Sequence, residues 1–312
     1  MENSSLVFTD DKTQKISGRL SESKALSGSF QKNLISFTKR INYDYYRFLW
    51  KINKLIEYRK YGYFSLTPGF LFKEFSSQRF RTNNYETYLM KNREMIFEET
   101  KTKFGIVFTD DTSVGALKEV FMERIYDSLS EFIPSKDDVV VDIGAQCGDF
   151  SLLCASYYGV KEVHSFEPLA GNFEKLETNI KLNEADQVMA YNFAVGSTNS
   201  IEKIYWDGDM MCKSETNNFE NITVKTLDSF KLHPTILKID VEGFELDVLE
   251  GAKETIMGEK PKIMLEVHSK LLKAQCISRL KSMGYRLVKS GRKNVNPLSE
   301  MNVIQNLYFL PN

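Results

Sequence analysis

Three side chains that can move a proton or hold a cation follow apolar runs in the second half of the chain. Asp240 and Glu242, spaced i, i+2, come after the run 236–239, and His268 ends the run 263–267. Carboxylates at a strand end can hold substrate hydroxyls, bind a divalent metal or act as a base, and an imidazole can accept a hydroxyl proton. We therefore expect Asp240, Glu242 and His268 to be catalytic, with Asp240 as a ligand of any divalent metal.

Structural roles are the alternative for each of these groups. Acids at a helix N-terminus are stabilised by the helix dipole, an interpretation that suits Glu245 particularly well. A lone histidine is more often structural than catalytic. We assign that structural role to His164, inside a predicted strand, and to His233, in a loop before Pro234.

A glycine turn stands between a buried strand and a helix at residues 141–150, Val-Asp-Ile-Gly-Ala-Gln-Cys-Gly-Asp-Phe. Gly144 would let the backbone approach a ligand, and Gly148 would permit a tight entry into the helix. The segment contains neither the GxGxxG of dinucleotide-binding proteins nor the Lys-Ser/Thr of a P-loop. A nucleotide-like ligand without a phosphate group fits this turn better than NAD or ATP, and an ordinary strand–helix turn is the alternative.

An acid ends the next predicted strand, nineteen residues after Gly148, in Phe166-Glu167-Pro168. A carboxylate at this place in a dinucleotide-binding fold accepts both ribose hydroxyls. The spacing between the glycine turn and Glu167 therefore predicts a site for a nucleoside.

Strand and helix patterns alternate from residue 138 onward and must position these groups. Apolar β-rich runs predict strands at 139–141, 163–166, 188–194, 236–239, 263–267, 285–288 and 307–310. Helical spacing predicts helices at 150–158, 173–182, 244–250 (closed by Gly251) and 271–283. This alternation indicates an α/β, Rossmann-like fold with a mostly parallel seven-stranded sheet, helices on both faces and ligands at the carboxyl ends of the strands.

The first third of the chain differs in composition. Residues 1–33 contain seven serines and predict a flexible tail, and residues 34–114 predict a helical extension before a catalytic domain at 115–312. Residues 31–73 hold nine Lys or Arg, two acids and many aromatics, so a basic amphipathic helix is expected there. It would pack on the main domain or, at residues 34–73, contact a membrane peripherally. An apolar stripe at 116–125 predicts a further helix that ends before Pro134.

Whole-chain properties narrow the class of protein. With 312 residues, a net charge of −1 and four cysteines lacking a CxxC pair, the chain predicts a protein of a reducing compartment with no general affinity for nucleic acid. No signal peptide or membrane span is recognisable. We expect a cytoplasmic protein and leave its oligomeric state open.

The motifs, taken together over residues 115–310, resemble the FkbM family of methyltransferases. The resemblance is carried by D-I-G-A-Q-C-G-D-F-S (142–151), F-E-P (166–168), N-I-x-L-N (179–183), N-x-A-V-G (192–196), T-L-D (226–228) and K-I-D-V-E-G (238–243). It implies S-adenosyl-L-methionine as cofactor and methyl transfer to an oxygen, often of a sugar or polyketide. The cofactor-binding residues that it implies are Asp142, Gly144, Ala145, Gln146, Gly148, Glu167, Pro168, Asn192 and Ala194. Gln146 departs from the asparagine usual in the family, which bears on contacts at the cofactor's amino-acid end.

The combined hypothesis is an O-methyltransferase that acts on a hydroxyl-bearing small molecule or glycan. Asp240 and Glu242 would position the hydroxyl or a divalent ion, and His268 would take the proton. The alternatives are a catalytically silent S-adenosylmethionine-binding protein and a membrane-docked accessory protein. An NAD-linked oxidoreductase is disfavoured by the missing GxGxxG, and a nucleic-acid base methyltransferase by the missing catalytic motifs.

Overall fold

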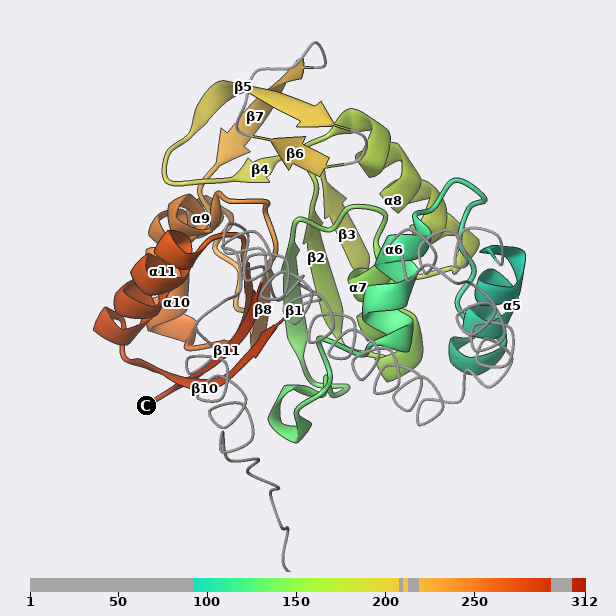
Figure 1. Ribbon diagram of the computed structural model, residues 1–312, viewed down its shortest axis with the longest axis horizontal. Coiled ribbons are helices and arrows are strands. Elements are labelled where there is room, and N and C mark those ends of the chain that lie inside the picture. The colour runs from blue at the N-terminus through green and yellow to red at the C-terminus, as the bar shows by residue number, and fades with distance from the viewer. Residues whose placement is uncertain (1–92, 208–209, 213–218, 293–304) are drawn as a thin grey trace, which may run out of the picture. The chain divides into compact units, whose positions relative to one another are not determined.

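The computed structural model describes residues 93–207, 210–212, 219–292 and 305–312 (Figure 1). All of them belong to the second of the two units into which the chain divides, Arg81–Asn312. The tail expected at 1–33 and the basic helix expected at 34–73 lie outside the described residues. Of the expected helical extension, the structure describes one helix, α5 (Arg93–Phe104).

A seven-stranded sheet forms the centre of the described unit, in the order β10-β11-β9-β8-β1-β2-β3. The strands are β1 (Val139–Ile143), β2 (Glu162–Phe166), β3 (Val188–Tyr191), β8 (Ile236–Ile239), β9 (Lys262–Val267), β10 (Tyr285–Arg292) and β11 (Gln305–Pro311). Only β11 runs antiparallel to its neighbours in this sheet. The inner strands are almost continuously apolar because both faces are covered, as expected for a parallel sheet.

Helices cover both faces of this sheet (Figure 1). On one face lie α9 (Glu245–Gly251), α10 (Lys253–Glu259) and α11 (Lys270–Ser282). On the other lie α7 (Asp149–Leu152), which continues as a π-helical segment to Tyr158, and α8 (Ala170–Leu182). This arrangement confirms the predicted α/β fold with a mostly parallel seven-stranded sheet.

A second, four-stranded sheet was not predicted. It is formed by β4 (Ala194–Val195), β5 (Ser200–Asp207), β6 (Met210–Cys212) and β7 (Phe219–Lys225), in the order β4-β7-β5-β6. The strand predicted at 188–194 therefore ends at Tyr191, and Ala194–Val195 pair with β7 instead. Figure 1 shows this second sheet above β2 and β3 of the main sheet.

Two further expectations need correction. The helix predicted from the stripe at 116–125 is short: α6 (Val114–Leu117) passes into a π-helical turn that ends at Met122, and Arg124 adopts a left-handed φ of 51°. Gly251 was expected to follow the end of a helix, but it is the last residue of α9. A Cβ there would lie 1.8 Å from the carbonyl oxygen of Gly196, so close packing against the residue after β4 requires the glycine.

None of the helices in the described part of the chain is both long enough and apolar enough to cross a membrane.

Candidate functional site

The glycine turn after β1 packs tightly between two other parts of the chain. Gly144 has a φ of +81°, and a Cβ there would lie 1.8 Å from the backbone carbonyl oxygen of Asp240. Gly148 has a φ of +85°, and its Cβ would lie 2.6 Å from the Leu176 side chain on α8. The close approach that requires these glycines is therefore made to the chain itself, and it holds the turn at the carboxyl end of β8.

A buried ion pair between β1 and β8 holds the glycine turn in place. Asp142 and Lys238 are directly opposite each other on β1 and β8, and Lys238 Nζ donates to Asp142 Oδ1 at 2.9 Å and to the Gly144 carbonyl at 3.1 Å. Asp142 Oδ2 accepts from Ser151 Oγ at 2.6 Å. Burial opposes the charge of Lys238, but the neighbouring carboxylates, first Asp142, raise its pKa above the ordinary value. Asp142 and Lys238 thus position the glycine turn. The sequence reasoning had not identified Lys238 as a residue of the site.

Glu167 joins the glycine turn to the turn after β2. Its carboxylate accepts hydrogen bonds from the backbone N–H of Gln146 at 2.9 Å and of Leu169 at 3.0 Å. Burial raises the pKa of Glu167 to about 7, against the lowering effect of these bonds. Asn192 supports the same turn by donating to the carbonyls of Glu167 and Pro168, at 3.0 and 3.1 Å. The structure therefore brings Glu167 and Asn192 together at the turn after β2.

A cavity of about 240 Å³ opens at the carboxyl ends of β1, β2 and β8. Three of the predicted cofactor residues line it: Gly144, Pro168 and Ala194. Its walls are mainly apolar. They include Phe166, Phe193, Val241 and Phe244 and, from the second sheet, Ile204, Ile222 and Val224. The other predicted cofactor residues do not line it: Asp142 and Ala145, which are fully buried, and Gln146, Gly148, Glu167 and Asn192. The cavity has the apolar lining expected of a small-molecule site.

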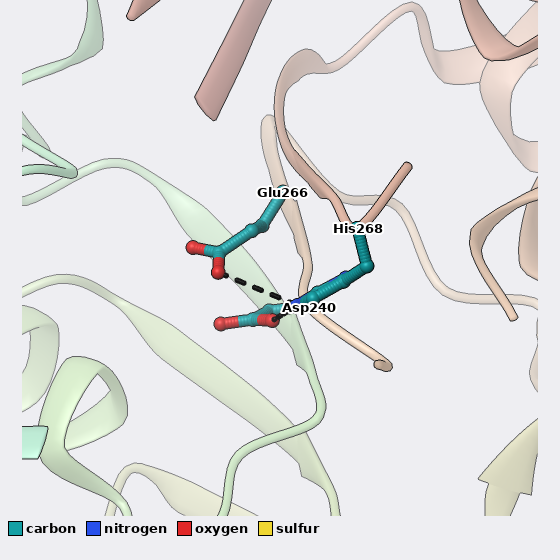
Figure 2. Close-up of side chains that lie close together, drawn as sticks. All are labelled: Asp240, Glu266 and His268. Carbon is teal, nitrogen blue, oxygen red and sulfur yellow. Dashed lines mark ion pairs between the residues drawn. The ribbon is translucent and has the colours of Figure 1, made fainter. Parts of the chain in front are cut away.

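The predicted catalytic residues meet at the adjacent ends of β8 and β9. Figure 2 shows Asp240, Glu266 and His268 turned toward one another. His268 Nε2 lies 3.9 Å from Asp240 Oδ1, 3.1 Å from Glu242 Oε2 and 3.5 Å from Glu266 Oε1. On its other side, Nδ1 donates to Glu245 Oε1 at 2.6 Å. The five residues, Asp240, Glu242, Glu245, Glu266 and His268, are called the carboxylate–histidine cluster below.

The environment of His268 argues against the role expected for it. Burial disfavours its charge, but the hydrogen bond to Glu245 and the nearby carboxylates of Glu266, Asp240 and Glu242 outweigh burial and raise its pKa to about 11. An imidazole with this pKa already carries its proton at neutral pH and has no lone pair with which to take another. The expectation that His268 is the base is therefore revised below.

Two members of the cluster were missed or assigned another role. Glu245, interpreted from the sequence as a helix N-terminal acid, is fully buried and accepts from the Gly243 backbone N–H at 2.8 Å as well as from His268. Glu266, 1% exposed, was not predicted. Strand alternation could have found it, because residues i and i+2 of β9 share a face and His268 was already a candidate.

A tyrosine from outside the strand–helix repeat also reaches the cluster. Tyr126 is buried, and its hydroxyl donates to Asp240 Oδ2 at 3.0 Å. Its ring packs on Phe150 at 4.9 Å between centroids, and the neighbouring Ile125 carbonyl accepts from the Tyr308 hydroxyl. The segment before β1 therefore contributes directly to the orientation of Asp240.

The remaining histidines have the structural surroundings expected of them. His164 is buried on β2, where Nδ1 lies 3.0 Å from the Tyr191 hydroxyl and Nε2 lies 3.1 Å from Glu162. Burial lowers the pKa of His164. His233 is exposed and pairs with Glu259 at 3.0 Å. Neither lines the cavity.

Asparagines of the motif at 179–183 hold α8 to the chain before β1. Asn179 accepts from the Thr109 N–H at 2.8 Å and donates to the Cys147 carbonyl in the glycine turn at 2.9 Å. Asn183 accepts from the Val107 N–H at 2.8 Å. These motif residues connect the segment at 107–109 to the glycine turn.

Comparison with known proteins shows similarity to methyltransferases. Residues 142–287 match the Methyltransferase FkbM domain. Methyltransferase 1 of Beauveria bassiana is 26% identical over 188 residues, which cover 47% of this chain and 74% of that protein. Hexuronic acid methyltransferase AglP of Haloferax volcanii is 24% identical over 144 residues, which cover 43% of this chain and 57% of that protein. The crystal structure of Methyltransferase FkbM from Methylobacillus flagellatus KT aligns over 72% of this chain and 60% of its own, with 20% identity and a TM-score of 0.41.

The matched residues begin at Asp142 on β1, include Glu167, Asp240 and Glu242, and end in β10. They span the glycine turn, the cavity and the whole carboxylate–histidine cluster, whereas Tyr126 lies outside them. Residues 142–287 thus match the Methyltransferase FkbM domain, and the chain is similar to methyltransferases over the residues that form this site.

Proposed function

We propose that the protein transfers a methyl group from S-adenosylmethionine to a hydroxyl oxygen of a sugar or glycan. The observation that carries the proposal is the place of the cavity: it lies at the carboxyl ends of β1, β2 and β8, where Gly144 borders it and Asp240 directly follows β8. A cofactor held there would have its reactive end near the carboxylate–histidine cluster. Ligands of open α/β sheets bind at this edge.

The residues present fit the nucleoside part of this cofactor. The apolar walls, including Phe193 and Phe244, suit a planar adenine ring. Glu167 sits between two residues that line the cavity, and an ionised carboxylate offers about four acceptor positions, of which the N–H groups of Gln146 and Leu169 use two. Glu167 would accept from the ribose hydroxyls. When bound, S-adenosylmethionine supplies an electrophilic methyl group on a sulfonium sulfur.

The carboxylate–histidine cluster would serve the acceptor. Asp240 and Glu242 would hold the acceptor hydroxyl in line with the methyl group, a placement that can contribute several kcal/mol to catalysis. Glu242 is the most exposed of the four acids, at 32%, and it has a left-handed φ of 50° that turns it away from the strand direction. We therefore assign to Glu242 the acceptance of the hydroxyl proton, in place of His268. His268 would hold the acids in position.

A sugar is proposed as acceptor for two reasons. One relative is named as a hexuronic acid methyltransferase, which is a property of that protein that we extend to this chain as a hypothesis. The aromatic and basic residues at 34–73 also suit a sugar that carries a negative charge, because aromatic faces stack on sugars and Lys or Arg attract anions. Peripheral contact of this segment with a membrane remains part of the proposal, as does a cytoplasmic location.

Mass spectrometry of glycans from cells with and without the gene tests the function directly. We expect one sugar to lose the mass of one methyl substitution when the gene is absent and to regain it with the wild-type gene but not with Glu242→Gln. Identical glycans in the parent, deletion and complemented cells would contradict a glycan acceptor. Purified protein that binds S-adenosylmethionine but yields no methylated product from the glycan pool of the deletion cells would favour the silent binding protein.

A further inference from the structure

His268 presents one nitrogen to an environment suited to a cation. Nε2 is buried and makes no hydrogen bond within the described part of the chain, although Glu242 Oε2 lies only 3.1 Å away. Carboxylate oxygens of Asp240 and Glu266 lie on the same side, at 3.9 and 3.5 Å. A nitrogen lone pair that faces carboxylates is repelled by them, so a positive charge must lie between, either a proton or a metal ion.

The other nitrogen of the ring is fixed by Glu245. A carboxylate can only accept, so Nδ1 carries a hydrogen and donates it to Glu245 Oε1 at 2.6 Å. Glu245 is in turn held by the Gly243 N–H, and its side chain is fully buried. A carboxylate–histidine pair of this kind orients many metal-binding imidazoles and raises their basicity. The pair directs Nε2 toward Asp240 and Glu266 (Figure 2).

The three candidate ligand atoms are near the separations that a single ion imposes. One atom each from Asp240, Glu266 and His268 all lie within 4.8 Å of one another. Ligands about 2.1 Å from one ion are roughly 3.0 to 3.4 Å apart at octahedral or tetrahedral angles. The shortest nitrogen–oxygen separation among the three residues, 3.5 Å to Glu266, needs almost no movement, and Asp240 at 3.9 Å needs only a small one.

We propose that Asp240, Glu266 and His268 bind one divalent transition-metal ion at the ends of β8 and β9. One imidazole and two carboxylates suit Mn²⁺ or Zn²⁺, whereas Mg²⁺ and Ca²⁺ prefer oxygen ligands alone. The remaining positions would be open to water and to the acceptor, on the side of the more exposed Glu242. Binding of the ion is independent of the proposed function. Its role, to lower the pKa of a bound acceptor hydroxyl so that a carboxylate can remove the proton, rests on that function.

Electron paramagnetic resonance of Mn²⁺, titrated into the metal-free full-length protein without cofactor, tests the site. We expect one Mn²⁺ to bind to the wild-type protein and binding to fall by at least tenfold in His268→Ala and in Glu266→Gln. Glu245→Gln, which keeps the shape of the residue that orients His268, should weaken binding by 10 to 100-fold. His233→Ala, which removes an exposed histidine paired with Glu259, is the matched control and should bind like the wild type.

Folding and selectivity are checked on the same samples. Asp240→Asn, which keeps the size of the side chain and one acceptor oxygen, should also lose Mn²⁺ while its thermal unfolding without metal remains close to that of the wild type. Mg²⁺ should not displace Mn²⁺ at equal concentration, whereas Zn²⁺ should. The proposal is overturned if the wild type fails to bind Mn²⁺ at millimolar concentration, if Mg²⁺ competes equally, or if folded His268→Ala binds as tightly as His233→Ala. Calorimetry with S-adenosylmethionine alone separates these failures from a failure of the proposed function.

Discussion

The glycine turn and the carboxylate–histidine cluster lie side by side, but they balance their charges in opposite ways. In the turn, Asp142 is matched by Lys238 and Ser151, and Glu167 by backbone N–H groups. In the cluster, four acids surround His268, one of whose nitrogens lacks a hydrogen bond within the described residues. The turn is therefore already organised by the fold, whereas the cluster is the place that we propose for a cation and the acceptor. Substitutions in the two regions should accordingly have different effects.

Substitution of the cluster acids should have the largest effect, and the property affected should be turnover. Asp240→Asn and Glu242→Gln keep the shape of each residue but remove its charge, so methyl transfer to the identified acceptor should fall by about 10² to 10⁴-fold. Cofactor affinity should change by less than about threefold. Steady-state kinetics and calorimetry measure the two quantities. Equal losses of turnover and of cofactor affinity would contradict the separate roles given to the cluster and the glycine turn.

A substitution in the anchor of the turn should instead destabilise the protein. Lys238→Met leaves Asp142 buried without its charge partner, which should lower the free energy of unfolding by about 3 to 5 kcal/mol. The double variant Asp142→Asn/Lys238→Met removes both charges and should recover part of this loss. Urea unfolding followed by circular dichroism provides the measurement. A loss below about 1 kcal/mol in the single variant would show that the pair does not anchor the turn.

Cofactor binding should depend on pH through Glu167, whose pKa burial raises to about 7. In the proposed site the ionised carboxylate would accept from the ribose hydroxyls, so affinity should increase about tenfold from pH 6 to pH 8 as the proton leaves. The main charged group that opposes this shift is Lys238. The free energy of unfolding of the unliganded protein should change in the opposite direction. Because the pKa of Glu167 is higher in the folded protein, its contribution to stability is lost as pH rises from 4.5 to 7.

Calorimetric titrations of S-adenosylmethionine at several pH values test this dependence. Glu167→Gln should bind more weakly than the wild type at pH 8 and should show almost no change in affinity between pH 6 and pH 8. An unchanged pH profile in this variant would assign the titration to another group.

Loss of the hydroxyl that links the segment before β1 to the cluster should have the smallest effect. Tyr126→Phe removes the hydrogen bond to Asp240 but keeps the ring against Phe150, so turnover should fall only severalfold, equivalent to about 0.5 to 1.5 kcal/mol. Asp240→Asn/Tyr126→Phe should be no slower than Asp240→Asn alone, because Tyr126 acts through Asp240. Additive losses in the double variant would mean that Tyr126 has a separate role.

Local sequence patterns were enough to predict the main sheet and the edge at which the site lies. The valine-rich run of β1, the acid after β2 and the acids after β8 each carry a signal within a few residues, and a parallel sheet brings such strand ends together. The second sheet was missed because β4 and β6 are very short and Asn192 ends β3 early through side-chain bonds to another loop. Hydrogen bonds between distant parts of the chain leave no periodic pattern in the sequence, so they could not be predicted from it.

The missed site residues depend on tertiary contacts in the same way. Lysine is seldom buried unless it is paired, so the burial of Lys238 follows only from its position opposite Asp142. Tyr126 reaches Asp240 across 114 positions of sequence. The charge state of His268 follows from four acids, of which Glu245 and Glu266 had not been connected with it.

The measurement that tests the central claim most directly is calorimetric titration of S-adenosylmethionine into the wild type, Glu167→Gln and Asp240→Asn at pH 8. The account predicts one site in the wild type, similar affinity in Asp240→Asn and a loss of at least tenfold in Glu167→Gln, with no binding of NAD. Absence of binding to the folded wild type, or a loss confined to Asp240→Asn, would contradict the placement of the cofactor beside the glycine turn.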